Sequence, residues 1–283
     1  MDEQGINILE RIHASYYQLT AAERKIADFV VANFARVQFM SITQLAEECG
    51  TAEATVSRFC RNLQLKGFNA FKLELARHTA AGAAPPLPVH GADTVLGRSR
   101  AAGAVSVDAV RQTVKLVDPA KVLGAVQLFE QAGQVLCIGS GGSMIMAQEF
   151  THLFSTVSSK FQTVVDSHLQ MSAVATMDTG GVLVLLSYSG ATTGGLQILE
   201  LAKSRGIPTV LVTRFNKSPA AKLADVVLLC GSNESPFQLG TVPAKIAQLV
   251  VMDILFQEYC QRNRAECDAH IQAVAAALSG MHI

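Results

Sequence analysis

The sequence lacks three features that would place a protein in a simple class: an excess of one charge, a long hydrophobic run, and closely paired cysteines. Its 23 basic and 23 acidic side chains cancel, so the net charge indicates no particular partner. No uncharged apolar run reaches the roughly 18 residues of a membrane-spanning helix, and no membrane contact is expected. The six cysteines include no C-x-x-C pair, which favours buried free thiols in a reducing cytoplasm over a metal or disulfide framework. Asp2 and Glu3 make the N-terminus acidic, so no secretory signal is predicted and a cytoplasmic protein is expected.

Length and apolar content are sufficient for two domains with a sizeable core. The chain has 283 residues, of which 49% are hydrophobic. Charge is unevenly distributed at the start: residues 1–53 carry four basic and eight acidic side chains, whereas residues 54–78 carry five basic and one acidic. Such a basic block is typical of a contact with a phosphate backbone, but it also fits a solvated helix face. Charge alone leaves both interpretations open.

Two capping boxes predict helix starts in the first quarter of the chain. They pair Thr20 with Glu23, and Ser41 with Gln44. Apolar residues follow each start at helical spacing, and Gly50 marks the end of the second helix. The same spacing returns in a third segment, at Val56, Phe59, Cys60 and Leu63. Two short helices of matching phase, joined by a glycine-containing turn, are what a helix-turn-helix needs to bury its shared face.

The third segment carries polar side chains opposite its apolar residues. They are Thr55, Ser57, Arg58, Arg61 and Asn62. Short hydroxyls and arginines on such a helix reach base edges and phosphates in the major groove of DNA. An αα-hairpin without nucleic acid would show the same periodicity, so the pattern alone leaves that alternative open.

The rest of the chain has a different pattern. Residues 79–105 are rich in alanine, glycine and proline and predict a flexible linker between a domain at 1–78 and a domain at 106–283. In the second domain, five short apolar runs alternate with helical stretches, which predicts a five-stranded parallel sheet covered on both faces. The predicted strands are Val135–Ile138, Phe161–Val165, Val182–Leu186, Thr209–Val212 and Val226–Leu229, and the predicted intervening helices lie near 142–154, 168–176, 192–205 and 218–224.

Two turns rich in serine, threonine and glycine follow predicted strands, at 139–143 and 187–193. Each leads into a predicted helix, whose N-terminal N–H groups and dipole favour an anion. Because ligands of parallel sheets bind beyond the carboxyl ends of the strands, both turns together predict a phosphate monoester site. Either turn alone would also fit an ordinary connection with capping residues.

Other phosphate and metal sites are disfavoured. No G-K-[ST] follows the glycines, which argues against a nucleoside triphosphate loop. A dinucleotide site would need a glycine where Met144 stands, although Asp166 has the position of a ribose-binding acid. No H-x-x-x-H pattern or acidic cluster supports a metal, so neither a metal nor another cofactor is predicted.

The N-terminal motifs resemble those of RpiR/MurR-type regulators, which join a helix-turn-helix to a sugar isomerase (SIS) domain. The resemblance rests on LTAAERKIADF at 19–29, SITQLAEECG at 41–50, ATVSRFCRNL at 54–63 and KGF at 66–68. It implies DNA binding, with Lys66 as a further contact. Two departures stand out: Thr51 and Ala52 replace the family's usual valine-serine pair, leaving Thr51 as an alternative helix cap, and Gln64 replaces a helix-ending glycine.

The C-terminal motifs resemble the SIS fold, a flavodoxin-like three-layer sandwich. They are GSGGS at 139–143, LSYSG at 186–190 and SPAAKLADVVL at 218–228. The resemblance implies a phosphosugar or related phosphorylated metabolite as effector. Its ligand contacts map onto Ser140, Gly141, Gly142, Ser143, Ser187, Ser189 and Thr192. Ala191 departs from the family's frequent glutamate, which leaves the sugar end of the pocket undefined.

The expected function is therefore a ligand-responsive regulator of transcription, without catalysis. The alternative is an aldose–ketose phosphosugar isomerase, which would need a general base such as Glu149, His152 or His168. A purely structural dimer module would leave both serine-rich turns unexplained. The long apolar helix predicted over 242–260 favours a homodimer or higher homo-oligomer, and a two-fold dimer would present two recognition helices to a palindromic operator in double-stranded DNA.

Overall fold

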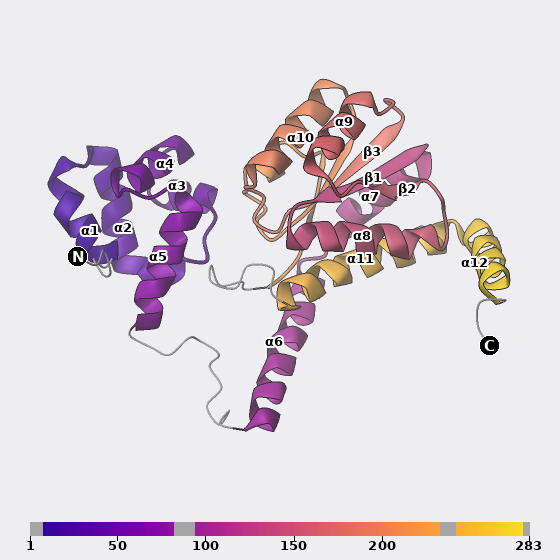
Figure 1. The fold of residues 1–283 in the computed structure, drawn as a ribbon, viewed down its shortest axis with the longest axis horizontal. Coiled ribbons are helices and arrows are strands. Elements are labelled where there is room, and N and C mark those ends of the chain that lie inside the picture. The colour runs from indigo at the N-terminus through magenta and orange to yellow at the C-terminus, as the bar shows by residue number, and fades with distance from the viewer. Residues whose placement is uncertain (1–7, 82–93, 233–241, 280–283) are drawn as a thin grey trace. The chain divides into compact units, whose positions relative to one another are not determined.

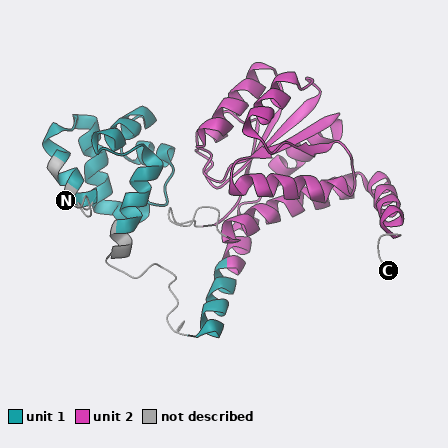
Figure 2. Ribbon diagram, viewed as in Figure 1, with its two compact units in different colours: residues 1–105, 233–239 teal, residues 106–232, 240–283 magenta. Residues whose placement is uncertain are grey.

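The computed structural model describes residues 8–81, 94–232 and 242–279, which form two compact units (Figure 2). The first unit extends to Val105 and the second begins at Ser106. Each unit has its own core, because the buried clusters of the two units share no residue. An all-α unit followed by an α/β unit confirms the predicted fold class.

The first unit is a bundle of short helices (Figure 1). They are α1 (Ile8–Ser15), a 3-10 turn (Tyr16–Gln18), α2 (Ala21–Val37), α3 (Ile42–Glu48), α4 (Glu53–Asn62) and α5 (Phe68–Ala81). Helix α4 packs on α2, α3 and α5, and Phe59 of α4 meets Phe71 of α5 edge to face, with ring centroids 5.6 Å apart. The turn between α3 and α4 contains Gly50 at φ +60°, as a helix-turn-helix requires.

Both predicted capping boxes are confirmed, at the starts of α2 and α3. Helix α4 differs, because its N-cap is Ala52 and no side chain caps it. The alternative that Thr51 caps this helix is wrong, since the Thr51 hydroxyl instead lies 3.5 Å from the carbonyl oxygen of Ala46. At the other end of α4, Gln64 takes the left-handed conformation, φ +60°, that glycine usually supplies.

Helix α6 (Val95–Lys115) begins inside the segment predicted as a linker. The alanine-rich composition that suggested a linker is also favourable for a helix, once the prolines before residue 89 are passed. Its C-terminal half belongs to the second unit, where Thr113 is fully buried. Helix α7 (Pro119–Gln131) follows, and the Asp118 carboxylate caps it by accepting from the N–H groups of Ala120 and Lys121.

The second unit contains a parallel sheet of five strands in the order β2-β1-β3-β4-β5. The strands are β1 (Gln134–Gly139), β2 (Phe161–Thr163), β3 (Gly181–Leu186), β4 (Thr209–Thr213) and β5 (Val226–Leu229). All five predicted strands are confirmed, although β2 ends at Thr163 rather than Val165.

Helices cover both faces of this sheet (Figure 1). Besides α7 they are α8 (Gly142–Ser155), α9 (Ser167–Thr176), α10 (Thr193–Ser204) and α11 (Val242–Arg262), whereas α12 (Arg264–Leu278) follows α11 and packs on it. Val135 and Cys137 of β1 face the core formed with α7, α8 and α11. Leu136 and Ile138, which alternate with them, face the core formed with α9 and α10, so the predicted three-layer sandwich is confirmed.

The helix predicted at 218–224 is wrong in length. Only a 3-10 turn, Ala220–Lys222, forms there. The chain must turn into β5 within a few residues, and Asp225 already accepts from the N–H and hydroxyl of Thr209 at the start of β4. Helix α12, which follows α11, was not predicted.

The six cysteines are free, and all but Cys260 are buried, as predicted. Burial raises the pKa of the Cys49 thiol to about 11 and that of Cys60 to about 12. The thiols therefore stay protonated near neutral pH and are poor metal ligands and nucleophiles. Among the helices within the described ranges, none combines the length and apolarity that crossing a membrane would take.

Candidate functional site

Helix α4 presents one polar face, and most of the predicted DNA contacts lie on it. Arg58, Arg61 and Asn62 are exposed and Ser57 is half-buried, whereas Lys66, also exposed, lies beyond the end of α4. Thr55 is different: only 8% of it is exposed, because it flanks the apolar stripe that packs into the bundle. The polar face of α4 therefore contains both arginines, Asn62 and Ser57, but not Thr55.

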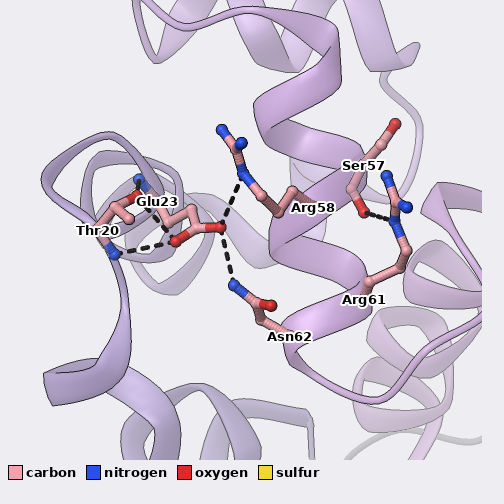
Figure 3. Close-up of polar contacts among 6 residues, drawn as sticks. All are labelled: Thr20, Glu23, Ser57, Arg58, Arg61 and Asn62. Carbon is pink, nitrogen blue, oxygen red and sulfur yellow. Dashed lines mark hydrogen bonds and ion pairs between the residues drawn. The ribbon is translucent and has the colours of Figure 1, made fainter.

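Glu23 of α2 lies beside this face and is almost completely buried, with 1% exposed (Figure 3). Its Oε2 accepts from the backbone N–H of Thr20 at 2.9 Å and from the Thr20 hydroxyl at 2.8 Å. Its Oε1 accepts from the side-chain amide of Asn62 at 2.9 Å and lies 3.6 Å from Nε of Arg58. The carboxylate that caps α2 thus also contacts two of the predicted DNA-binding residues.

The two arginines of α4 are oriented by these contacts. In Figure 3 the Nε of Arg58 faces Glu23, and its terminal nitrogens lie farther from that carboxylate. The Nε–H of Arg61 donates to the carbonyl oxygen of Ser57 at 3.4 Å. The terminal amino groups, which form the planar fork used against guanine edges and phosphates, are the parts directed outward.

The second candidate site lies where β1 and β3 end. These strands are neighbours, with Gly139 paired to Leu186. The chain runs from β1 outward to β2 and then crosses back to β3 on the other side of β1. Parallel sheets of this order bind ligands in the crevice at such a switch point. Both serine-rich turns, 139–143 and 187–193, start here.

The two helices that follow these turns have N-termini without side-chain caps. Helix α8 begins after Gly141 and α10 after Thr192, and neither residue accepts a capping hydrogen bond through its side chain. Helix N-termini of this kind favour an anion. The predicted hydroxyls differ in access: Ser140 and Thr192 are exposed, Ser143 and Ser189 are half-buried, and Ser187 is buried.

Close backbone approach shapes both turns. A Cβ on Gly139 would lie 2.6 Å from the carbonyl oxygen of Ser143. Gly190 has φ +60°, and a Cβ there would lie 2.1 Å from Oγ of Ser218. The buried amide of Gln170, on α9, donates to the carbonyl oxygen of Gly139 at 3.0 Å and so supports the turn 139–143 from the interior of the unit. Both turns are held in place by packing that only glycine permits.

Comparison with known families identifies both units. A family model described as "Helix-turn-helix domain, rpiR family" matches residues 6–82, and one described as "SIS domain" matches residues 128–257.

The chain joins an rpiR-family helix-turn-helix domain to a SIS domain, the two domains of an RpiR-type transcriptional regulator.

Curated relatives match this chain over almost its whole length. An uncharacterized HTH-type transcriptional regulator of Caldanaerobacter subterraneus is 28% identical, covering 96% of this chain and 97% of the relative. HexR of Pseudomonas aeruginosa, also an HTH-type transcriptional regulator, is 28% identical, covering 96% and 95%. The solved structure of NanR of Vibrio vulnificus, complexed with ManNAc-6P, has a TM-score of 0.88 at 26% identity and covers 98% of this chain and all of NanR.

Two of the three residues considered as a general base, Glu149 and His152, lie away from the start of α8. Glu149 and His152 form an exposed pair on α8, with Nδ1 and Oε1 3.7 Å apart. Glu149 is seven residues beyond the start of α8 at Gly142, which places it about 10 Å along the axis. A base must lie within about 3 Å of the proton that it takes. His168 is exposed near the start of α9. Within the described ranges, no three His, Cys, Asp or Glu residues cluster as metal ligands.

Three residues near the two sites were not predicted as functional. Glu23 was identified only as a capping residue, because its contact with Asn62 joins positions 39 residues apart. Gln170 carries no motif signal, and only the fold brings it to the first turn. Tyr188 stands within the LSYSG motif, but its contact with Ser232 joins positions 44 residues apart.

Proposed function

We propose that this chain is a DNA-binding regulator whose second unit senses a phosphorylated sugar and thereby changes operator binding. One observation carries the proposal: the neighbouring strands β1 and β3 end at the sheet's switch point and lead into helices whose N-termini have no side-chain caps, in a chain whose α4 exposes oriented arginines. NanR, which was solved with ManNAc-6P, supports a sugar phosphate as the class of effector.

Helix α4 is the proposed recognition helix. Arg58 and Arg61 would direct their terminal amino groups to guanine edges or phosphates, and Lys66 would contact the backbone. Ser57 and Asn62 would add polar contacts. Thr55 is too deeply buried to share this role in the proposal.

The crevice between β1 and β3 is the proposed effector site. The phosphate would lie against the starts of α8 and α10, where N–H groups and hydroxyls converge. The proposed contacts are Ser140, Gly141, Gly142, Ser143, Ser187, Ser189 and Thr192. With Ala191 in place of a carboxylate, the sugar itself would be selected by other groups.

We propose binding without turnover, since Glu149 and His152 lie too far along α8 to act on a sugar at its N-terminus. The relatives named as regulators favour the same interpretation. A homodimer is proposed from the exposed apolar side chains Val242 and Leu249 on α11, and a two-fold dimer would bind a palindromic operator. The cytoplasm, where DNA and sugar phosphates meet, is the proposed location.

A thermal-shift experiment tests the effector site. At least one sugar phosphate, from a set of pentose and hexose phosphates that includes ManNAc-6P, is expected to stabilise the wild-type chain by about 2.7 kcal/mol at 100 times its Kd. Ser140→Ala combined with Ser189→Ala is expected to abolish the shift, because two hydroxyls facing the phosphate are lost. DNA binding without sugar should remain as in the wild type.

The matched control is Ser172→Ala, which removes an exposed hydroxyl that bonds within α9 to the carbonyl oxygen of His168. This variant should keep the full shift. Retention of the shift in the double variant, or absence of a shift with every sugar phosphate, would contradict the effector site. Turnover of any of these sugars would favour the isomerase instead.

A chain of contacts leads from the proposed effector site to α6. Tyr188 lies between Ser187 and Ser189, and its hydroxyl donates to the carbonyl oxygen of Ser232. The neighbouring Gly231 donates its N–H to the hydroxyl of Thr113, at 3.0 Å. Gly231 packs directly on α6, because a Cβ there would lie 2.7 Å from the backbone nitrogen of Thr113. Helix α6 is the element through which the chain continues toward the first unit.

Tyr188→Phe is therefore expected to uncouple sensing from DNA binding. It removes the bond to Ser232 and leaves the serine hydroxyls of the turn in place, so sugar affinity should change by less than about twofold. The ratio of operator affinities with and without sugar should become about fivefold smaller, which is a loss of about 1 kcal/mol of coupling free energy. Isothermal titration with sugar, and operator titrations with and without it, measure the two quantities. An unchanged sugar effect would contradict this route.

A further inference from the structure

We infer that Glu23 is a positioning residue for DNA recognition, which sets the sequence specificity of α4 without touching DNA. The inference rests on the proposed function, in which Arg58 and Asn62 contact DNA. It extends that function to a residue of another helix, one that is inaccessible to any nucleic acid because only 1% of it is exposed.

The hydrogen bonds of Glu23 divide between its two oxygens. Oε2 serves the start of its own helix, where it accepts from the N–H and the hydroxyl of Thr20. Capping alone would need only this half of the carboxylate. Oε1 faces α4 and accepts from Asn62, with Nε of Arg58 at 3.6 Å (Figure 3). The second oxygen therefore has a role that capping does not explain.

This arrangement restricts what Asn62 and Arg58 can present. A carboxylate only accepts hydrogen bonds, so the Asn62 side chain must turn its NH₂ group inward, which leaves its carbonyl oxygen for the outside. Arg58 has an exposed side chain, 60% accessible, and a long side chain of this kind is normally free to rotate. The buried charge of Glu23 attracts the Nε side of the Arg58 guanidinium, so that the two terminal amino groups of Arg58 point away from the protein.

Orientation of this kind affects specific and non-specific DNA binding differently. A phosphate accepts a guanidinium from many directions, whereas a guanine edge requires the planar fork in one orientation. Loss of the Glu23 charge should therefore weaken binding to the operator and leave binding to unrelated DNA almost unchanged. A merely structural residue would lower stability and alter both kinds of binding together, in proportion to the folded fraction.

The experiment uses the full chain and a duplex selected by it in vitro from random DNA, with a scrambled duplex of equal length for comparison. Arg58→Ala should lower operator affinity 10-fold or more. Glu23→Gln should lower it about 10-fold, with less than a twofold change on the scrambled duplex. In the double variant, Glu23→Gln should add less than twofold to the effect of Arg58→Ala, because the amide keeps an oxygen for Asn62 and what is lost is the charge beside Arg58.

Thr20→Ala is the matched control for stability. It removes the cap hydroxyl at the same helix start and leaves the Glu23 carboxylate beside Arg58, so the melting temperature should fall while the ratio of operator to scrambled affinity stays at the wild-type value. Should Glu23→Gln fold poorly, the same measurements are made in a Gln64→Gly background, where glycine relieves the positive φ at the end of α4.

The outcomes separate this inference from the proposed function. If no duplex is selected, or if Arg58→Ala binds the operator as the wild type does, the proposed DNA contact is wrong. Arg58→Ala could weaken binding while Glu23→Gln keeps the wild-type ratio of operator to scrambled affinity. Alternatively, the losses of operator affinity in the two single variants could multiply in the double variant. Either result overturns only the positioning role of Glu23.

Discussion

Replacement of Gly190 by alanine is expected to destabilise the second unit by about 3 kcal/mol and to remove its response to sugar phosphate. Gly190 has φ +60°, a conformation that costs a non-glycine residue about 1–2 kcal/mol. The new Cβ would also lie 2.1 Å from Oγ and 2.5 Å from Cβ of Ser218, and overpacking of this kind costs about 1–3 kcal/mol. Ser218 is fully buried and cannot move aside, so the turn 187–193 must shift away from the crevice.

Two companion variants separate the causes of this effect. Ser218→Gly in the Gly190→Ala background removes the overlapping atoms and should recover the packing part of the loss, leaving the cost of the left-handed backbone. Gly124→Ala, in the middle of α7 with nothing within 4 Å of the new Cβ, should instead stabilise the unit by about 1 kcal/mol. Urea unfolding measures all three. If the free energy of unfolding of Gly190→Ala is within about 0.5 kcal/mol of the wild-type value, the turn can accommodate a Cβ and the prediction is wrong.

The sequence predicts most of the second unit because its signals are local. A strand such as Val182–Leu186 is a continuous apolar run between turn residues, and it forms at β3 almost as predicted. The caps at Thr20, Ser41 and Asp118 involve partners within three residues, so a short window is enough to find them. The ends of α8, α9 and α10, which pack on the sheet, are also marked by local turn residues.

The misses arise where composition is ambiguous or partners are distant. The alanines of residues 95–105 suit a linker and a helix equally, and in α6 the helix forms. Thr55 was assigned to the outward face from its polarity, although its position on α4 places it against the core. The link from Glu23 to Asn62 depends on how α2 packs on α4, and the link from Tyr188 to Ser232 depends on the order of strands in the sheet. A single sequence carries neither piece of information.

Phe154→Ala is expected to destabilise the second unit by about 3–5 kcal/mol, the usual cost of truncating a fully buried phenylalanine. Phe154 lies in α8 at the centre of an aromatic cluster. Its ring centroid is 4.6 Å from that of Phe150, 4.3 Å from that of Phe161 and 5.4 Å from that of Phe256. The cluster joins α8, β2 and α11, so the cavity would loosen the helix whose N-terminus lines the proposed effector site. Phe154→Leu, which keeps most of the volume, should cost less than about 1.5 kcal/mol.

The same variant tests how the two units are connected. The core of the first unit, around Phe59 and Phe71, shares no residue with the cluster around Phe154. If the units unfold independently, Phe154→Ala should lower the second unit's transition and leave the first unit's transition unchanged, as followed by circular dichroism and by operator binding at increasing urea. A shift of both transitions together would mean that the units unfold as one cooperative block. In that case the two units would share stability, and a change of that shared stability would be one way for the sugar to act through α6.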